Sequence, residues 1–455
     1  MQNSLELAPY TRFIKQYDLI LGKPAPLELY PMSQTKAKVQ ELKDLYEIGE
    51  IPPLGHVPKN MYAWAIRRDR QGPPEQAMQL EVVETPTLDS QEVLVLVMAA
   101  GVNYNGVWAA LGTPVSMFDV HKQPYHIAGS DASGIVYAVG SKVTRCKVGD
   151  EVVVHCNQTD GDDEECNGGD PMFSSSQRIW GYETPDGSFA QFCRVQAQQI
   201  MPRPKHLTWE ESACYTLTLA TTYRMLYGHR PHILSPGDNV LVWGASGGLG
   251  SFAVQLCATA GANAIGVVSD ESKREFVMSL GAKGVIIRND FNCWGQLPQV
   301  NGPGFAEYMT EVRKFGKAIW DITGKGVDVD FVFEHPGEAT FPVSCMVCKR
   351  GGMVVFCAGT TGYNLTFDAR FVWMRQKRIQ GSHFANLQQA SQANRLVIDR
   401  RIDPCMSEVF PFSDIPKAHT KMWKNEHAPG NMAVMVSAKR PGLRTVEDAI
   451  EAGLE

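Results

Sequence analysis

The chain has 455 residues, 44% of them hydrophobic and 20% charged, which is enough apolar material for roughly two to four globular domains. The 43 Lys and Arg residues against 49 Asp and Glu residues give a net charge of −6, so there is no reason to expect nucleic acid as a partner. No apolar run reaches about 20 residues and no basic-then-apolar leader opens the chain, so the sequence predicts no membrane partner and no secretion signal.

The first half of the chain shows two different sequence patterns, one helical and one of short strands. Residues 1–60 are predicted to form a polar, helical extension, because residues 33–50 carry apolar side chains at helical spacing and a Pro-rich stretch follows them. Residues 61–211 contain short Val-rich strands separated by Gly-rich turns, which indicates a barrel-like β domain. These residues are therefore expected to form the first part of a β-rich domain.

Strands and helices alternate over residues 212–384. A helix over residues 208–227 is expected to lead into this region, opened by a capping box of Thr208 and Glu211. Continuous apolar strands between helices predict a parallel sheet that is covered on both faces. Residues 385–455 return to a mixed pattern. The simplest architecture is an α/β protein in which a doubly wound domain is inserted between two parts of the β-rich domain.

The strongest local motif is "NVLVWGASGGLGSFAVQL", residues 239–256. Its glycines lie between a predicted strand and a predicted helix, the arrangement of a Rossmann dinucleotide site. Glycines let the backbone approach a pyrophosphate, and free N–H groups at the helix start bind its charge. The alternative is a tight structural turn. The predicted cofactor contacts in this loop are Gly244, Ser246, Gly247, Gly248 and Leu249.

The end of the next predicted strand indicates which dinucleotide binds. NAD-binding domains usually carry an acid there for the ribose hydroxyls. Here Ser269 occupies that position, and Lys273 and Arg274 follow one helical turn later. A hydroxyl and a cation suit a 2′-phosphate, so the sequence favours NADPH, although the neighbouring Asp270 weakens the distinction. A solvated helix face explains Arg274 equally well.

A dinucleotide domain inserted into a β-rich domain resembles the medium-chain dehydrogenase/reductase superfamily, whose catalytic domain is GroES-like. Many members bind zinc through Cys and a Gly-His-Glu stretch. The corresponding stretch here, residues 128–134, offers Ser130 and Asp131, which are poor substitutes for imidazole or thiolate. Cys156 and Cys166 stand alone where a four-cysteine lobe would lie. The prediction is therefore no metal, and the eleven scattered cysteines are typical of reduced thiols in a cytoplasmic protein.

A closer resemblance rests on six segments between residues 41 and 386. They are "ELKDLYEIGEIPPLGHVPKNMYAWAIRR", "GVNYNGVWAALG", "QPYHIAGSDASGIV", "QRIWGYETPDGSFAQF", "VFEHPG" and "QKRIQGSHFAN". Together they are similar to the crotonyl-CoA carboxylase/reductase family. That resemblance implies that NADPH delivers hydride to the β-carbon of an enoyl-CoA such as crotonyl-CoA, and that the enolate then attacks CO2 to give ethylmalonyl-CoA.

The resemblance also implies a four-residue CO2 pocket. In this sequence it falls on Asn105 (or Asn103 in the other register), Tyr182, Glu183 and His383. N–H groups of the asparagine and histidine would stabilise the charge that grows on CO2. The tyrosine would shield the enolate from water, and the glutamate would act through a water or by orienting the imidazole. Each has an ordinary alternative: Glu183 could cap a turn, and the asparagines could be turn residues.

Further implications concern the substrate and the assembly. The family uses an arginine matching Arg370 to bind the adenine end of CoA, and its members are homotetramers built as dimers of dimers. Glu334 and His335, which follow a predicted strand, are expected to line the nicotinamide side.

Three rival functions remain open from the sequence. The nearest is an NADPH-dependent enoyl-CoA reductase that protonates the enolate instead of carboxylating it. A quinone or alkenal reductase would need neither the extension nor the CoA cations. A non-catalytic relative of the crystallin type would share only the fold, since fold alone does not prove activity.

Overall fold

The computed structural model describes residues 42–454. Most of the predicted helical extension lies outside these residues. Residues 42–59 form turns and no helix, so the expectation of a helix to residue 50 is wrong for its described part. The cause is tertiary contact: the Asp44 carbonyl accepts from the Asn60 amide at 2.8 Å, and Tyr46 is buried. Gly49 then turns the chain at φ +86°, in the left-handed region.

The β-rich domain is built from segments at both ends of the described chain. A seven-stranded sheet has the order β10-β6-β5-β3-β18-β17, with β9 also paired to β3, and a three-stranded sheet has the order β2-β1-β4. The two C-terminal strands join the first sheet because β18 pairs antiparallel with β3. The strands are β1 (Asn60–Ile66), β2 (Gln79–Glu84), β3 (Glu92–Val102), β4 (His126–Ile127), β5 (Ala132–Val139), β6 (Glu151–Val154), β7 (Asn157–Gln158), β8 (Arg178–Ile179), β9 (Phe192–Gln196), β10 (Ile200–Pro202), β17 (Met406–Phe410) and β18 (Asn431–Met435).

Short helices close the ends and sides of these sheets. The α-helices are α1 (Pro74–Ala77), α2 (Tyr104–Leu111), α3 (Met117–Val120), α4 (Trp209–Ala213), α12 (Ile415–Trp423) and α13 (Val446–Leu454). The 3-10 turns are η2 (Arg68–Arg70), η3 (Pro171–Phe173), η4 (Ala197–Gln199) and η7 (Phe412–Asp414). Three of the four catalytic candidates lie on α2 or in the turn that follows β8.

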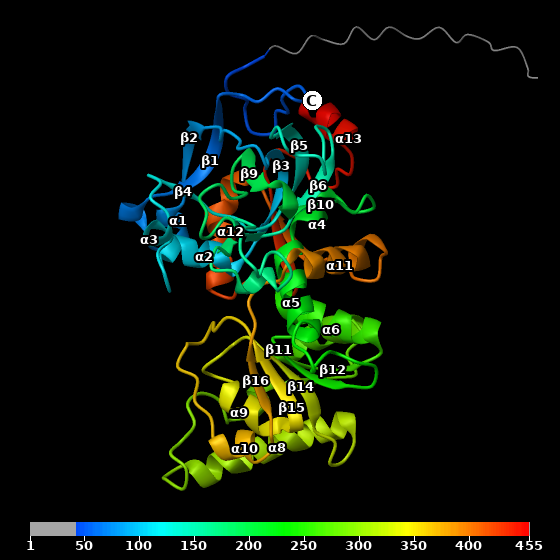
Figure 1. Cartoon of the computed structure of the whole chain (residues 1–455). Helices are drawn as coiled ribbons and strands as arrows, with labels where there is room; N and C mark the ends of the chain where they lie inside the picture. Colours follow the sequence, from blue (N-terminus) through cyan, green and yellow to red (C-terminus); the bar gives the residue numbers. More distant parts are fainter. Residues whose placement is uncertain (1–41, 455) are drawn as a thin grey trace, which may run out of the picture. The chain divides into compact units, whose positions relative to one another are not determined.

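Between these segments lies a six-stranded parallel sheet of order β13-β12-β11-β14-β15-β16 (Figure 1). Alternate residues of β11 (Asn239–Trp243) enter different cores: Val240 and Val242 pack with α5 and α6, whereas Leu241 and Trp243 pack with α8 and α9. The sheet is therefore apolar on both faces and covered on both, as a doubly wound domain requires. The predicted fold class is confirmed.

The elements of this domain follow one another as strand and helix. The strands are β11, β12 (Asn263–Val268), β13 (Gly284–Ile287), β14 (Val329–Glu334), β15 (Cys348–Phe356) and β16 (Arg378–Gly381). The helices are α5 (Thr216–Tyr227), α6 (Gly248–Ala260), α7 (Arg274–Ser279), α8 (Phe305–Thr323), α9 (Phe341–Val347), α10 (Ala369–Trp373) and α11 (Leu387–Ile398), with 3-10 turns η5 (Glu271–Lys273) and η6 (Arg288–Asp290).

The helix expected over residues 208–227 is interrupted. Its start is as predicted: the Thr208 hydroxyl accepts from the Glu211 amide, and the Glu211 carboxylate accepts from the Thr208 amide at 2.8 Å. The helix ends at Ala213 and a second one, α5, begins at Thr216. The break has a distant cause, because the Asp131 carboxylate accepts from the Leu217 amide at 2.7 Å and fixes the start of α5.

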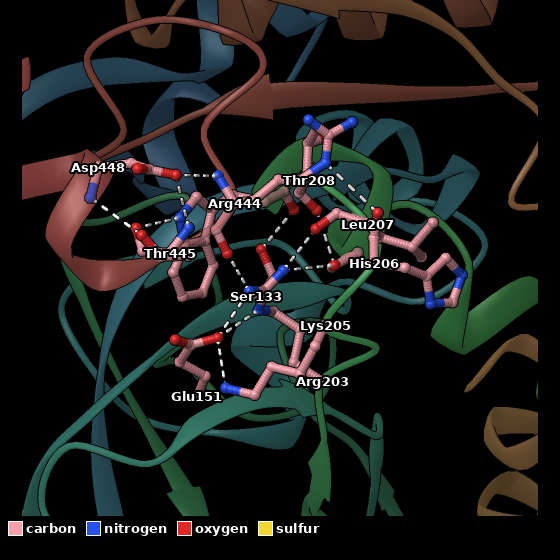
Figure 2. A network of polar contacts seen from close by, with 12 residues as sticks. Ser133, Glu151, Arg203, Lys205, His206, Leu207, Thr208, Arg444, Thr445 and Asp448 are labelled. Carbon is pink, nitrogen blue, oxygen red and sulfur yellow. Dashed lines mark hydrogen bonds and ion pairs between the residues drawn. The ribbon is translucent and has the colours of Figure 1, made fainter. Parts of the chain in front are cut away.

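A buried arginine ties the C-terminal segment to the β-rich domain (Figure 2). The Arg203 guanidinium donates to the Glu151 carboxylate at 2.6 Å and to the Leu207 carbonyl at 2.7 Å. It also donates to the carbonyl of Arg444 and lies 4.1 Å from the Trp209 ring centroid. Strand, helix and C-terminal chain are therefore joined through one side chain that has no exposed surface.

None of the helices within residues 42–454 combines the length and the apolarity needed to cross a bilayer.

Candidate active site

The glycine-rich loop forms the turn between β11 and α6. Gly244 adopts φ +54°, and a Cβ there would lie 2.8 Å from the His335 ring. A Cβ on Gly250 would lie 2.2 Å from the Gly244 carbonyl oxygen. Gly247 precedes the 13-residue helix α6, whose first amides have no acceptor within the helix. A side chain at Gly244 or Gly250 would clash with neighbouring atoms, so both positions require glycine. The loop presents the backbone N–H groups that a pyrophosphate needs.

The end of β12 holds a hydroxyl and a cation together. The Lys273 ammonium donates to the Ser269 hydroxyl at 2.8 Å, and that hydroxyl donates to the Asp270 carboxylate at 2.7 Å. Arg274 is engaged elsewhere, with the Glu271 carboxylate at 2.5 Å. The pair of Ser269 and Lys273 therefore fits a ribose 2′-phosphate. The ion pair of Arg274 agrees with the alternative that this residue belongs to a solvated helix surface.

Both asparagines of "NYNGVW" are buried and bonded to the residues that follow β4. Asn105, on α2, donates to the Ser130 hydroxyl at 3.4 Å. Asn103 donates to the Asp131 carboxylate at 2.9 Å. The Asn103 amide donates to a buried carboxylate that also accepts from the start of α5. The bond of Asn105 is longer and goes to a neutral hydroxyl, so a substrate can replace it more easily. This difference favours the register that assigns Asn105 to the pocket.

Tyr182 and Glu183 lie in a tight turn after β8. The Tyr182 hydroxyl donates to the Val115 carbonyl at 3.0 Å, and burial raises the pKa of this phenol to about 12. One carboxylate oxygen of Glu183 accepts from the Ile179 amide at 2.8 Å, so the turn-capping alternative is partly realised. Within residues 42–454 the other oxygen has no hydrogen-bond partner. Burial raises the pKa of Glu183, and the bond from Ile179 opposes that rise.

His383 lies in the segment between β16 and α11. Its ring packs against Phe384 with centroids 4.4 Å apart, and the residue is exposed to solvent. Enclosure by neighbouring protein atoms lowers its pKa, and the positive charge of Arg224 lowers it further. The imidazole is therefore neutral at pH 7, with one N–H donor and one acceptor nitrogen.

The four pocket candidates are linked through main-chain neighbours. Gly181 packs so closely on Gly129 that a Cβ would lie 1.9 Å from its carbonyl oxygen. The backbone next to Tyr182 therefore lies against the backbone next to Ser130, whose hydroxyl bonds Asn105. The His383 segment is tied to the same region by two bonds at the end of β6. His155 bonds the Ala385 carbonyl at 2.8 Å, and the Cys156 carbonyl accepts from the Trp180 amide at 2.8 Å. Within the described chain, no hydrogen bond, ion pair or ring contact joins His383 to the other three.

Glu334 has a different position from the one expected. It is fully buried, and its carboxylate accepts from the Gly337 amide at 3.1 Å, the Thr340 hydroxyl at 2.7 Å and the Ser344 hydroxyl at 2.5 Å. It therefore braces the loop after β14 from inside and does not line the nicotinamide side. Burial raises the pKa of this carboxyl to about 7, and its three donors moderate the rise. His335 remains beside Gly244 and bonds the Trp243 carbonyl at 3.0 Å.

The stretch where zinc-dependent relatives carry ligands serves a structural purpose here. Asp131 is completely buried and accepts from Asn103, Thr216 and the Leu217 amide. Across residues 42–454, no three His, Cys, Asp or Glu side chains lie close enough together to hold a metal ion. All eleven cysteines, which lie within that range, are free thiols.

Arg370 lies in the first turn of α10, at the surface. Its guanidinium forms a two-pronged ion pair with the buried Asp368, with Nη2–Oδ2 at 2.7 Å and Nε–Oδ1 at 3.0 Å. The carboxylate fixes the orientation of the guanidinium and leaves about half of the side chain exposed, at 48%. Its role in CoA binding stays a prediction.

Sequence patterns alone do not identify two parts of this site. The Val115 carbonyl that accepts from Tyr182 lies 67 residues away and carries no side-chain signal. Asp170 bonds Arg224 at 2.7 Å and Asn386 at 3.0 Å, and these partners lie 54 and 216 residues away in the sequence. One local signal was available: Asn386 and Gln389 form a capping box with the usual three-residue spacing.

Family models match both halves of the architecture. The model "Alcohol dehydrogenase GroES-like domain" matches residues 89–205, and "Zinc-binding dehydrogenase" matches residues 248–399. With the doubly wound domain and its glycine-rich loop, these matches define a member of the medium-chain dehydrogenase/reductase superfamily.

More specific relatives share nearly the whole chain. A protein of Cereibacter sphaeroides named crotonyl-CoA carboxylase/reductase is 78% identical over 90% of this chain and 96% of its own. A solved structure titled crotonyl-CoA carboxylase/reductase matches with a TM-score of 0.89 and 76% identity, over 92% of this chain and 97% of that one. A 2-octenoyl-CoA carboxylase reductase in complex with NADP and 2-octenoyl-CoA matches with a TM-score of 0.80 and 36% identity, over 88% and 93%. The chain belongs to the crotonyl-CoA carboxylase/reductase family.

Proposed function

We propose that this chain catalyses the NADPH-dependent reductive carboxylation of an α,β-unsaturated acyl-CoA, with crotonyl-CoA, CO2 and NADPH giving ethylmalonyl-CoA and NADP⁺. The observation that carries the proposal is the 78% identity over 90% of the chain to a crotonyl-CoA carboxylase/reductase. The structure of a relative with NADP and 2-octenoyl-CoA supports both the cofactor and the substrate class.

The cofactor would be held by the loop and the strand end described above. The backbone N–H groups around Gly247 and Gly248 fit the pyrophosphate, and Ser269 and Lys273 fit the 2′-phosphate. NADPH, when bound, supplies the hydride. Gly244, Ser246 and Leu249 shape the loop, and His335 bonds the carbonyl of Trp243, the residue just before it.

The substrate's β-carbon gains the hydride, and the electron pair of its double bond becomes the enolate. The α-carbon then forms a C–C bond to the carbon of CO2, and one C=O π bond opens to a carboxylate. Amide N–H of Asn105 and ring N–H of His383 would stabilise the negative charge that grows on those oxygens. A direct contact of Glu183 with the forming carboxylate would be repulsive, so its unbonded oxygen would hold a water or orient the imidazole.

Exclusion of water decides whether the enolate meets CO2 or a proton. Tyr182 would form that barrier, since its ring is buried and its hydroxyl is turned away to Val115. The hydroxyl is therefore engaged and offers no proton to the enolate. A protonated enolate would give butyryl-CoA, the product of the non-carboxylating alternative.

The remaining parts of the proposal concern binding, assembly and location. Arg370, oriented by Asp368, would bind the phosphate or adenine end of CoA. We expect a homotetramer from the family resemblance, and a cytoplasmic location from the eleven free thiols.

The test is NADPH absorbance after crotonyl-CoA is added, with and without bicarbonate, followed by mass analysis of the product. The proposal predicts faster oxidation with bicarbonate and a product heavier by CO2. If the rate of NADPH oxidation does not depend on bicarbonate and the only product is butyryl-CoA, the chain is a non-carboxylating enoyl-CoA reductase. No oxidation with any enoyl-CoA would overturn both.

A further inference from the structure

We propose that Asp170 and Arg224 are positioning residues for carboxylation, because together they fix the segment that carries His383 against the β-rich domain. The inference rests on the function proposed above. It concerns residues that no pocket motif includes. Asp170 precedes η3 in the loop between β7 and β8, and Arg224 lies on α5.

Four side chains form a closed polar ring. The Asp170 carboxylate accepts from Arg224 at 2.7 Å and from the Asn386 amide at 3.0 Å. Arg224 also donates to the Gln389 side chain at 3.1 Å. Gln389 and Asn386 close the ring through the α11 capping box, in which the side-chain oxygen of each residue accepts from the main-chain amide of the other. The start of α11 is therefore held to a loop more than 200 residues earlier.

The ring holds one end of a segment whose other end is also fixed. Ser382 donates its amide to the Phe356 carbonyl at 2.9 Å, and its hydroxyl bonds His229 at 3.0 Å. Between the two ends, Phe384 adopts φ +41°, a left-handed conformation that is costly for a bulky residue. Surrounding structure must enforce that conformation, and it determines where His383 points.

The pair also controls charge beside His383. Arg224 is 3% exposed and carries the cation that disfavours an imidazolium at His383. The other charged or titratable groups here are Asp170, His229, Arg378 and His155. Asp170 neutralises part of that cation, and burial lowers the pKa of His229, which Arg224 and Arg378 lower further. His155 is buried and bonds the Ala385 carbonyl. A neutral His383 retains an N–H donor and an acceptor nitrogen through the ordinary assay range.

The experiment compares the ratio of carboxylated to reduced product in three variants. Asp170→Asn removes the charge that binds Arg224, and Asn386→Ser removes the link to Asp170 while it retains a helix-capping hydroxyl. We expect each to lower the ratio about tenfold or more, since small misplacements of reacting groups carry large rate costs. The KM for NADPH should stay within about twofold, because the ring does not touch the cofactor loop.

The third variant, Arg224→Gln, tests the electrostatic part. Burial is the larger cause of the lowered pKa of His383 and remains in the variant, so losing the Arg224 cation should raise this pKa only in part. As the pH is lowered from 7 to 5, the product ratio of the variant should therefore begin to fall at a higher pH than that of the wild type. A purely structural role would not move this pH profile. If Asp170→Asn does not fold, Asn386→Ser carries the test, because it changes no charge.

Glu151→Gln is the matched control, since it weakens a buried ion pair of comparable burial that lies in the Figure 2 network. Its product ratio should equal that of the wild type. Wild-type ratios in folded Asp170→Asn and Asn386→Ser, or an equal loss in Glu151→Gln, would overturn the inference and leave the proposed function intact. A wild type that makes only butyryl-CoA would overturn both.

Discussion

The hydroxyl of Tyr182 donates its hydrogen bond to the carbonyl oxygen of Val115, 3.0 Å away, and so points out of the turn that also carries Glu183. The two residues join the loop after α2 to the loop after β8. The aromatic ring is left as the part of the side chain that can cover a reactive carbanion, and the polar part is used for structure.

Tyr182→Phe should therefore keep the wild-type product ratio. It loses one hydrogen bond, which costs about 1 kcal/mol of stability. Tyr182→Ala removes the ring and should shift product toward butyryl-CoA, because water then reaches the enolate. Product analysis of the two variants checks this. Equal ratios in both would show that the ring is not the barrier.

Cofactor preference should depend on Lys273 more than on its neighbour. Lys273→Met removes the ammonium that bonds Ser269, and we expect the KM for NADPH to rise about tenfold or more while activity with NADH changes little. Arg274→Met is the control, since that guanidinium is paired with Glu271. Steady-state kinetics with NADPH and NADH measure the KM values. An equal rise in the KM for NADPH in both variants would contradict the assignment of Lys273 to the 2′-phosphate.

The buried carboxyl of Glu334 predicts a pH-dependent stability. Its folded pKa of about 7 lies above the ordinary value of 4.5, so the folded state binds this proton more tightly than the unfolded state. The resulting stabilisation is complete below pH 4.5 and is lost as the pH rises through 7. It amounts to about 3 kcal/mol, at 1.36 kcal/mol per pKa unit.

Glu334→Gln cannot titrate and should lack this part of the pH dependence. Denaturant unfolding of both proteins from pH 5 to 8 gives the difference directly, and Asp131, whose pKa is also about 7, cancels because it is present in both. Parallel stability curves for the two proteins would show that Glu334 is ionised throughout.

The Arg203 network predicts where stability is concentrated. Arg203→Met leaves Glu151 without its buried partner and the Arg444 and Leu207 carbonyls without donors, so we expect a loss of about 3–5 kcal/mol in the free energy of unfolding. Lys205 contacts the same carboxylate at 2.7 Å but is exposed. Lys205→Ala should cost under about 1 kcal/mol. Similar losses for both variants in urea unfolding would contradict this view.

The sequence predicts those features whose causes are local. The glycine-rich loop, the Ser269–Lys273 pair and the Thr208–Glu211 capping box each depend on residues within one helical turn or one strand-to-helix connection. The fold class follows from the alternation of apolar strands and helices, which sets both faces of the sheet.

The features that the sequence does not predict have distant causes. The break before α5 depends on Asp131, 86 residues from the amide that it accepts from. Glu334 ends β14, and its burial depends on hydroxyl groups at the start of α9, those of Thr340 and Ser344, which donate to its carboxylate. The segment 42–50 has helical spacing, but contacts with the β-rich domain outweigh that local preference.

The central claim is that a sheltered pocket lets the enolate meet CO2 before water. The most direct measurement is the mass of the product formed from crotonyl-CoA, NADPH and ¹³C-bicarbonate by the wild type, Glu183→Gln and His383→Asn. We predict labelled ethylmalonyl-CoA from the wild type and mainly unlabelled butyryl-CoA from the variants, with NADPH oxidation still measurable in each and a ratio lowered on the order of 10²-fold, as for loss of an oxyanion donor. Wild-type ratios in both variants would contradict the claim.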